Sequence, residues 1–145
     1  TRVLRAEAAD KVALDFLKSK SNKAFTHFIS EFKGANNIKV DASNKTIYIS
    51  CATGDVHNRI RYSLKGRWLN TIKTYDNSKL PDDVRDLITD NYPRFRIFGV
   101  ALEVHVGPKM AHLVLIETDK EWKRIKVVEG EYEEYEAYKK VSSNK

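Results

Sequence analysis

Two histidines have the spacing that comes nearest to a metal site in this chain. His105 and His112 flank a turn expected at residues 107–110, which would place them opposite each other on antiparallel strands, with Glu103 on the same face. Cross-strand histidine pairs can bind Zn²⁺ or Cu²⁺. Because only two or three ligands are visible, we expect a solvated histidine pair, with no bound metal and no other cofactor.

Carboxylates are numerous, but their positions indicate structure rather than catalysis. Asp82 and Asp83 follow Pro81 and suit the first turn of a helix, where the helix dipole favours negative charge. The acidic run 131–136 predicts a solvated strand or a short helix. General acid–base catalysis needs a perturbed carboxyl group in a cleft, and the chain has neither a glycine-rich phosphate loop nor a G-x-S-x-G nucleophile motif. We therefore predict that the protein is not an enzyme.

Aromatic and cationic residues recur together in two segments, 59–68 around Trp68 and 122–126 around Trp122. A sheet face that bears both kinds of side chain can hold a protein loop or stack on bases or sugars. Strand alternation could instead turn the rings inward and leave only the cations in solvent. The candidate partner-binding residues, which alternation or turn position should leave near solvent, are Tyr62, Arg67, His105 and Arg124.

The elements that carry these residues follow from hydrophobic periodicity. Spacings of three and four predict a helix at 6–20, with a stripe of Ala9, Val12, Ala13, Phe16 and Leu17, and a second helix at 23–32. The period then changes to two. It predicts strands from residue 38, from residue 47, at 59–62 and at 68–72, with a turn at 41–45, a loop at 52–58 and a turn at 65–66.

The order then repeats. A third helix is expected between Pro81 and Pro93, followed by an alternating strand with one apolar face, and by strands at 112–116 and 122–128. Ala24, Phe28 and Phe32 match Val84, Ile88 and Tyr92 at an offset of 60 (84 − 24), and Trp68 matches Trp122 at an offset of 54 (122 − 68). This pattern indicates an internal duplication, in which the two tryptophans would occupy the same position.

The predicted fold is α+β, with two helix-plus-meander repeats that form one antiparallel sheet with helices on one face. The predicted division is a single domain with repeats at 1–76 and 77–138 and a tail at 139–145. The residues expected to be substantially buried are Phe28, Phe32, Ile60, Trp68, Ile88, Tyr92, Leu102, Val104 and Trp122.

Composition narrows the possible partners and the compartment. The single cysteine, Cys51, cannot form an internal disulfide and is expected to be a buried, inert thiol. The net charge of +6 permits nucleic acid as a partner, but the cations are scattered and form no basic block. There is no apolar run of the ~20 residues needed to span a bilayer. The chain begins without a methionine or an apolar signal core, as expected after removal of a targeting peptide or at a chosen boundary.

Two motifs resemble a known family. KLPDDVRDLITDNYP resembles the helix opening of PepSY-like proteins related to the β-lactamase inhibitor protein, and D-K-x-W-K-x-I resembles their terminal hairpin. The segments GRWLNTIKTYDNSKLPDDVRDLI and WKRIKVVEGEYEEYE also resemble small uncharacterised secreted proteins of Gram-negative bacteria. The resemblance implies tandem helix-plus-sheet units, export across the inner membrane with loss of a signal peptide, and no known enzymatic activity.

The function expected from the sequence is that of a secreted or periplasmic, non-enzymatic binding protein. Its partner would be a protein that is not identified, and inhibition of that partner is one form such binding can take. The alternative is a nucleic-acid or polyanion-binding protein, because the sequence pI is about 9.3.

Overall fold

The computed structural model describes residues 2–141 of the chain and the side chains of residues 5–141. Thr1 and residues 142–145 of the predicted tail lie outside this part. Helices and an antiparallel sheet confirm the α+β class. In chain order the elements are α1 (Arg2–Lys20), α2 (Asn22–Glu31), β1 (Asn36–Ser43), β2 (Thr46–Thr53), β3 (Val56–Ser63), β4 (Trp68–Asp76), the 3-10 helix η1 (Asn77–Lys79), α3 (Asp82–Asn91), β5 (Arg96–Val106), β6 (Lys109–Glu117), β7 (Glu121–Val128) and β8 (Glu131–Lys139).

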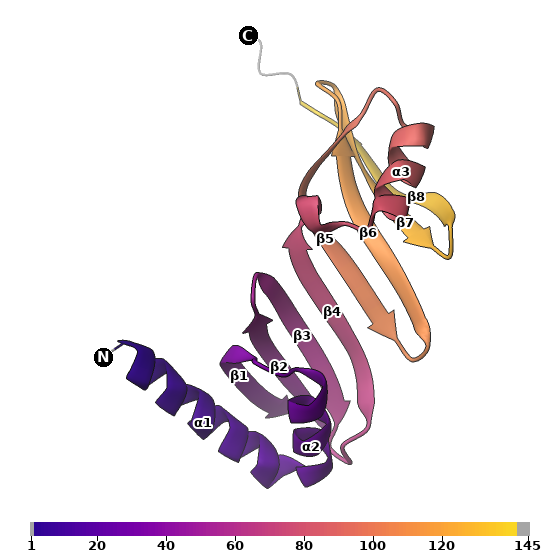
Figure 1. The fold of residues 1–145 in the computed structure, drawn as a ribbon. Helices are drawn as coiled ribbons and strands as arrows, with labels where there is room; N and C mark the ends of the chain where they lie inside the picture. The colour runs from indigo at the N-terminus through magenta and orange to yellow at the C-terminus, as the bar shows by residue number, and fades with distance from the viewer. Residues whose placement is uncertain (1, 142–145) are drawn as a thin grey trace. The chain divides into compact units, whose positions relative to one another are not determined.

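The strands lie in the sheet in the order of the sequence, from β1 to β8. The chain divides into two compact units. Unit 1 comprises Thr1–Lys73 and His105–Gly107, and unit 2 comprises Thr74–Val104 and Pro108–Lys145. Figure 1 shows α1 and α2 with the first strands of unit 1, and α3 with β6, β7 and β8 of unit 2. The predicted repeat boundary between residues 76 and 77 stays a prediction.

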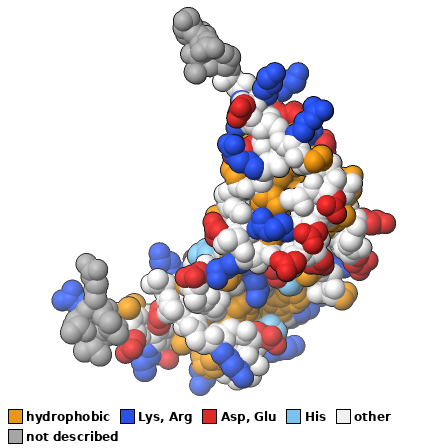
Figure 2. Space-filling model, turned by 45° about the horizontal axis from the view of Figure 1, so that its top comes forward, with side chains coloured by type: hydrophobic (Ala, Val, Ile, Leu, Met, Phe, Trp, Pro, Cys, Tyr) orange, Lys and Arg blue, Asp and Glu red, His pale blue; other side chains and the backbone are white. Residues whose placement is uncertain are grey.

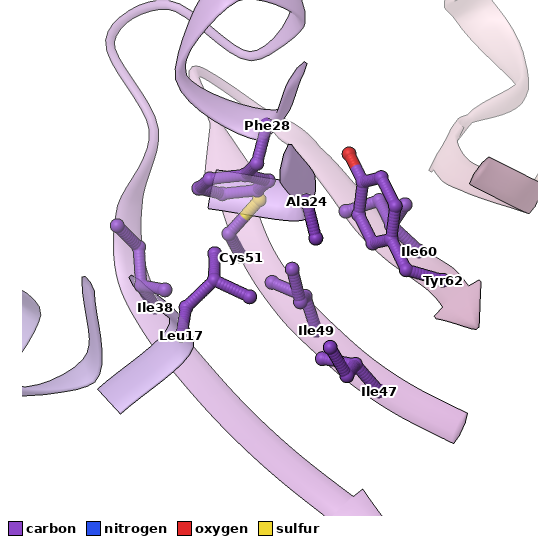
Figure 3. Close-up of a cluster of buried hydrophobic side chains, with 9 residues drawn as sticks. All are labelled: Leu17, Ala24, Phe28, Ile38, Ile47, Ile49, Cys51, Ile60 and Tyr62. Carbon is purple, nitrogen blue, oxygen red and sulfur yellow. The ribbon is translucent and has the colours of Figure 1, made fainter. Parts of the chain in front are cut away.

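The core of unit 1 lies between its two helices and one face of β1, β2 and β3 (Figure 3). Alternation places every second residue of each strand on this face. Burial of one large apolar side chain contributes about 1.5–3 kcal/mol, so the cluster is a main source of stability for the unit. Its buried members are Leu17, Ala24, Phe28, Ile38, Ile47, Ile49, Cys51, Ile60 and Tyr62. The predicted burial of Cys51 is confirmed.

The N-terminal helix α1 buries only part of the predicted stripe. Val12 is 69% exposed and Phe16 is also exposed, whereas Leu17 is fully buried. Asp10, two turns before Leu17 on the same side, accepts a hydrogen bond of 2.8 Å from the backbone N–H of Ile38 in β1. The predicted stripe is therefore confirmed at Leu17 and Ala13, which pack in the core, and is wrong at Val12 and Phe16. Apolar periodicity does not reveal that the carboxylate of Asp10 takes part in the helix–strand contact.

Two connections that were predicted to be longer are two-residue turns. β2 and β3 leave only residues 54–55 between them, and β5 and β6 leave only residues 107–108. Gly54 and Gly107 open these turns with φ values of +61° and +59°, and two-residue hairpins favour such positive φ values. The predicted loop at 52–58 is therefore mostly strand, because the glycine allows the chain to reverse at once.

Gly66, in the turn between β3 and β4, lies against the N-terminus of α2. A Cβ added to Gly66 would lie 2.6 Å from Lys23 Cβ and 2.7 Å from Ser21 Oγ. Ser21 is the N-cap of α2, and its hydroxyl accepts a hydrogen bond of 3.1 Å from the backbone N–H of Ala24. The absence of a side chain at Gly66 therefore lets the turn pack directly on the helix cap.

Replacement of Gly66 by alanine is expected to lower the free energy of unfolding by about 3 kcal/mol, because an unfavourable φ of +88° is combined with a clash against the cap. Urea denaturation measures the loss. Gly34→Ala is the matched control, since Gly34 has φ +77° but no atom within 4 Å of the added Cβ. The control should lose only the backbone cost of about 1–2 kcal/mol. Equal losses in the two variants would contradict the packing role of Gly66.

The helices α2 and α3 confirm the predicted offset of 60 between the two parts of the chain. Each has 10 residues and begins 60 positions from the other (82 − 22). Both end in the same way: the backbone N–H of Phe32 donates to the carbonyl of Phe28, and that of Tyr92 donates to the carbonyl of Ile88. β1 and β5 also begin 60 positions apart (96 − 36). The same helix pattern, with the same C-terminal hydrogen bond, thus occurs twice in the chain.

The predicted equivalence of the two tryptophans is wrong. After its helix, each unit has four strands in chain order, and Trp68 opens the fourth strand, β4, whereas Trp122 lies in the third strand, β7. The offset of 54 therefore joined two strands that do not correspond. Of the residues expected to be substantially buried, Phe28, Ile60 and Ile88 are buried, and Phe32, Trp68, Tyr92, Leu102, Val104 and Trp122 are half-buried.

Candidate binding surface

Tyr62, which was expected near solvent, is fully buried in unit 1. Its hydroxyl oxygen lies 2.7 Å from Nδ1 of His27, and the two rings meet edge-on with centroids 5.4 Å apart. Burial raises the pKa of the Tyr62 hydroxyl. The expectation of solvent exposure was wrong because Tyr62 shares the inward face of β3 with Ile60, two residues before it.

The other three candidate residues are partly accessible but do not gather in one unit. Arg67 is exposed in the turn between β3 and β4. His105 is half-buried in unit 1, where it lines a cavity of about 330 Å³ with His27 and Trp68. Arg124 is half-buried in unit 2. Their role in partner binding stays a prediction.

The expectation of two solvated histidines is wrong. His112 is buried in unit 2, and its Nε2 lies 3.6 Å from Oε2 of Glu103. The hydroxyl of Tyr75 donates a hydrogen bond of 2.7 Å to the same oxygen. Burial, and after it this hydrogen bond, raise the pKa of Tyr75. Across residues 5–141, no group of three or more His, Cys, Asp or Glu side chains is placed to hold a metal.

The alternating strand β5 turns its apolar residues away from this buried network. Ala101 is fully buried, and Glu103 belongs to the network, so both lie on the inward face. Val100 is 49% exposed, and Leu102 and Val104 are half-buried on the opposite face. The side of β5 that was expected to be buried is therefore the more exposed one. Alternation separates the two faces of a strand, but it does not show which face a helix covers.

The neighbouring strands continue this face. Leu113 and Leu115 of β6 lie directly opposite Lys126 and Arg124 of β7, and directly opposite residues share one face of a sheet. Helix α3 covers the other face, because residues of α3 line a cavity together with His112 and Val127. We call the face without a helix the open face of unit 2. Its residues are Val100, Leu102, Val104, Leu113, Leu115, Trp122, Arg124, Lys126, Glu136 and Tyr138.

One end of the open face carries an ordered aromatic and charged group. Trp122 lies opposite Tyr138 of β8, and their rings stack with centroids 4.5 Å apart. Nε of Arg124 donates a hydrogen bond of 2.8 Å to Glu136, and the Tyr138 hydroxyl donates one of 3.0 Å to the same carboxylate. This bond raises the pKa of Tyr138. The contacts hold the side chains in defined positions before any partner arrives.

The strand β8 makes this arrangement possible. The acidic run was expected to form a strand or a short helix, and the strand is confirmed by its pairing with β7. On its other face, Glu134 accepts a hydrogen bond of 2.8 Å from Lys123, which lowers the pKa of Glu134. Glu133, Glu134 and Glu136 therefore pair with cations of β7 instead of forming a free acidic tail.

The composition of the open face is that of a candidate binding surface. Its apolar centre and its tyrosine, tryptophan and arginine side chains are the types enriched where proteins bind each other. A face of this kind on one side of a sheet is a common interaction site. The pattern that could have revealed it in the sequence is the apolar row of β5, which was read as core.

Comparison with known proteins shows what this fold resembles. No protein family and no curated protein matches the chain in sequence. A BLIP-like protein from Bacteroides fragilis has a TM-score of 0.62 at 14% identity, over 86% of this chain and 89% of its own. A DUF2874 family protein from Bacteroides ovatus has a TM-score of 0.61 at 10% identity, over 82% of this chain and 86% of its own. The chain has the fold of these proteins.

A third structure, a candidate periplasmic protein from Bacteroides eggerthii, has a TM-score of 0.59 at 8% identity, over 81% of this chain and 86% of its own. The resemblance to proteins of the β-lactamase-inhibitor type is thus confirmed at the level of the fold, although identities this low show nothing beyond it. Within the described residues, no helix is both long and apolar enough to cross a membrane.

Proposed function

We propose that the protein is a non-enzymatic binding protein of the periplasm or the cell exterior, which holds a protein partner on the open face of unit 2. The observation that carries the proposal is the burial pattern of β5. Val100 is about half exposed and Leu102 and Val104 are only partly covered, although these residues alternate as a core strand would. Exposed apolar side chains cost free energy in water, and a partner that covered them would recover it.

The polar end of the open face gives such a partner something to recognise. In protein interfaces a few aromatic and arginine side chains provide most of the binding energy. Tyr138 and Arg124 are of these types, and both are already fixed, by Trp122 and by Glu136. A fixed side chain loses little conformational entropy on binding, so pre-organisation raises affinity.

The compartment and the form of binding are supported by the neighbours in fold. One is named as a candidate periplasmic protein and another as BLIP-like. A fold shared with these proteins supports export, and it makes inhibition of an enzyme one form that the binding could take. The PepSY-like resemblance of the third helix supports the same compartment.

Replacement of Val100 by aspartate is expected to weaken partner binding at least tenfold, because an unpaired carboxylate would be buried in an apolar contact. The partner is first isolated from a Gram-negative periplasmic extract on the immobilised wild-type chain and identified by mass spectrometry. Its affinity for each variant is then measured with purified proteins. If the partner is an enzyme, its activity is followed as the chain is added.

Ile29→Asp is the matched control, since Ile29 in α2 is 42% exposed and lies in unit 1. This variant gains the same charge and should bind as the wild type does, and thermal unfolding shows whether each variant remains folded. A specific partner that binds the Val100 variant as tightly as the wild type would contradict the proposed face. Turnover of a substrate by the purified chain, lost on changing one acidic or histidine residue, would contradict the non-enzymatic function.

The alternative function, polyanion binding, is favoured by one group of residues. Arg61 lies over the ring of Tyr48, with 5.5 Å between Cζ and the ring centroid, and Arg59 is a near neighbour on the same strand. Figure 2, however, shows Lys and Arg side chains interspersed with Asp and Glu side chains over the face in view. A polymer of phosphates would therefore meet repulsion as well as attraction, and its binding should be weak and sensitive to salt.

A further inference from the structure

Three polar side chains form a straight row across unit 1. Lys39 of β1 lies directly opposite Ser50 of β2, and Ser50 lies directly opposite Arg59 of β3. Directly opposite residues have Cβ atoms about 4.5–5.5 Å apart and point to the same side of the sheet. A lysine and an arginine therefore flank one hydroxyl, on the face opposite the core of unit 1.

Tight turns fix this register. The turn between β1 and β2 consists of Asn44 and Lys45, whose φ values are +50° and +61°, and two residues with positive φ form the type I′ turn that closes a hairpin without slack. The two-residue turn at 54–55 closes the next hairpin. A shift of one residue in either hairpin would move one member of the row to the core face. The pairing of the strands therefore fixes which three residues stand next to one another in the row.

The side chains of the row are available. Lys39 and Arg59 are exposed, and Ser50 is half-buried. Among residues 5–141, no hydrogen bond or ion pair of the Lys39, Ser50 or Arg59 side chain occurs within the sheet. Unit 2 differs, since Lys123 and Arg124 pair with glutamates of β8. The two cations of the row thus form no ion pair with a carboxylate of the described residues, although Asp41 lines the same cavity.

The row lies in a cavity of about 410 Å³, which is within the ~300–1,000 Å³ range of small-molecule sites. Besides the row, the cavity is lined by two further charged residues, Asp41 and Arg61. The rest of the lining is Val40, Tyr48, Ile49, Ile60, Asn70 and Ile72. A guanidinium, an ammonium and a hydroxyl are donors that suit the oxygens of a phosphate or sulfate group. Tyr48 and Ile72 provide an apolar wall for an organic group attached to it.

The next row indicates that the ligand is small. Asp41 lies directly opposite Tyr48, and Tyr48 directly opposite Arg61. This second row is two residues from the first, about 7 Å along the strands. There Arg61 is held over the tyrosine ring and Asp41 would repel a second phosphate. A single anionic group fits the site, whereas a chain of anions would meet a carboxylate.

From this arrangement we infer that the cavity of unit 1 binds a small organic anion, a phosphate or sulfate monoester with an apolar body. The anionic group would lie above Ser50 between Lys39 and Arg59, and the apolar body would lie against Tyr48 and Ile72. The site belongs to unit 1 and is independent of the partner face proposed for unit 2. If the experiment on one site fails, the proposal for the other site still depends only on its own experiment.

The test is a titration of the whole chain, followed by amide chemical shifts and by calorimetry. The probes are phenyl phosphate, phenyl sulfate, inorganic phosphate and phenol, with heparin and a single-stranded oligonucleotide as polymers. Phenyl phosphate or phenyl sulfate is expected to bind more tightly than inorganic phosphate and phenol, with shifts centred on Ser50 and Tyr48. The comparison of the two esters shows which anion the site prefers.

Arg59→Gln is expected to weaken binding of the preferred ester about tenfold, which is the loss of one charge-assisted contact. Arg67→Gln is the matched control: it removes the same charge from an exposed arginine outside the row, and it should change the affinity less than about twofold. Thermal unfolding checks that both variants remain folded.

Three results would overturn the inference. The first is the absence of saturable binding of either ester up to about 10 mM, beyond which an affinity carries little free energy. The second is an equal loss in the Arg59 and Arg67 variants, which would mean attraction by net charge alone. The third is tighter binding of heparin or the oligonucleotide than of the esters, which would favour the polyanion function instead.

Discussion

Replacement of Tyr62 by alanine is expected to lower the free energy of unfolding by about 4 kcal/mol, because it empties a fully buried aromatic site and leaves a cavity in unit 1. It also removes the hydroxyl that lies 2.7 Å from His27. Urea denaturation followed by circular dichroism measures the loss. Tyr62→Phe keeps the ring and should lose only about 1 kcal/mol, the net contribution of one hydrogen bond.

Tyr48 is the matched control for this experiment, because it lies on the opposite face of the sheet and is 39% exposed. Tyr48→Ala should cost less than about 1 kcal/mol, as is usual for surface positions. Equal losses at the two tyrosines would contradict the placement of Tyr62 in the core. Tyr62→Phe should also leave partner binding unchanged, since the residue has no surface that a partner can reach.

The free energy of unfolding is expected to stay level up to about pH 9 and then to fall steeply. Burial raises the pKa of the Cys51 thiol from 9.0 to about 11. Burial is also the largest cause of the rise in the pKa of Tyr92 from 10.0 to about 12. The pKa values of Tyr62 and Tyr75 are also raised. An acid whose pKa is higher in the folded chain stabilises it fully below the unfolded pKa, and this stabilisation is lost as the pH rises to the folded value.

Cys51→Ala separates the contribution of the thiol from that of the tyrosines. In the wild-type chain the thiol alone should account for a loss of roughly 2 kcal/mol between pH 9 and pH 11. Urea denaturation at several pH values should therefore give a shallower decline for the variant over this interval, whatever its stability at neutral pH. Parallel curves for the two proteins, or a wild-type curve that stays level to pH 12, would contradict the prediction.

Burial also determines the reactivity of Cys51. A thiol attacks other groups as the thiolate, and a raised pKa together with 1% exposure leaves almost none of it at neutral pH. The thiol is therefore a core side chain. This agrees with a chain whose candidate sites are surfaces rather than reactive groups.

In each unit one face of the strands has no helix on it, and the side chains on this face differ between the units. In unit 1 the face carries Lys39, Ser50 and Arg59, which suit a small anion, and in unit 2 it carries an apolar row with an aromatic end, which suits a protein. Both faces arise because, among the described residues, the helices of each unit lie on only one side of its strands. The two faces differ because different side chains occupy the strand positions that point away from the helices.

The sequence by itself determined the local structure of this protein. Spacings of three and four residues located the helices, spacings of two located the strands, and the repeated helix pattern gave the offset of 60 that α2 and α3 share. These features depend on residues close together in the chain, which is why they can be predicted. The α+β class followed from the same patterns, and the short motifs pointed to a fold that the structural comparison confirmed.

Only the tertiary structure decided which side of each element is buried. Val100 alternates as a core residue does and yet is exposed, while Tyr62 alternates with arginines and yet is buried, because alternation gives two faces and the position of a helix selects one of them. The predicted equivalence of Trp68 and Trp122 failed for a related reason. The number of residues between two strands does not show how many hairpins lie between them. Contacts between distant residues therefore fixed the candidate binding surfaces, and such contacts cannot be predicted from a local pattern.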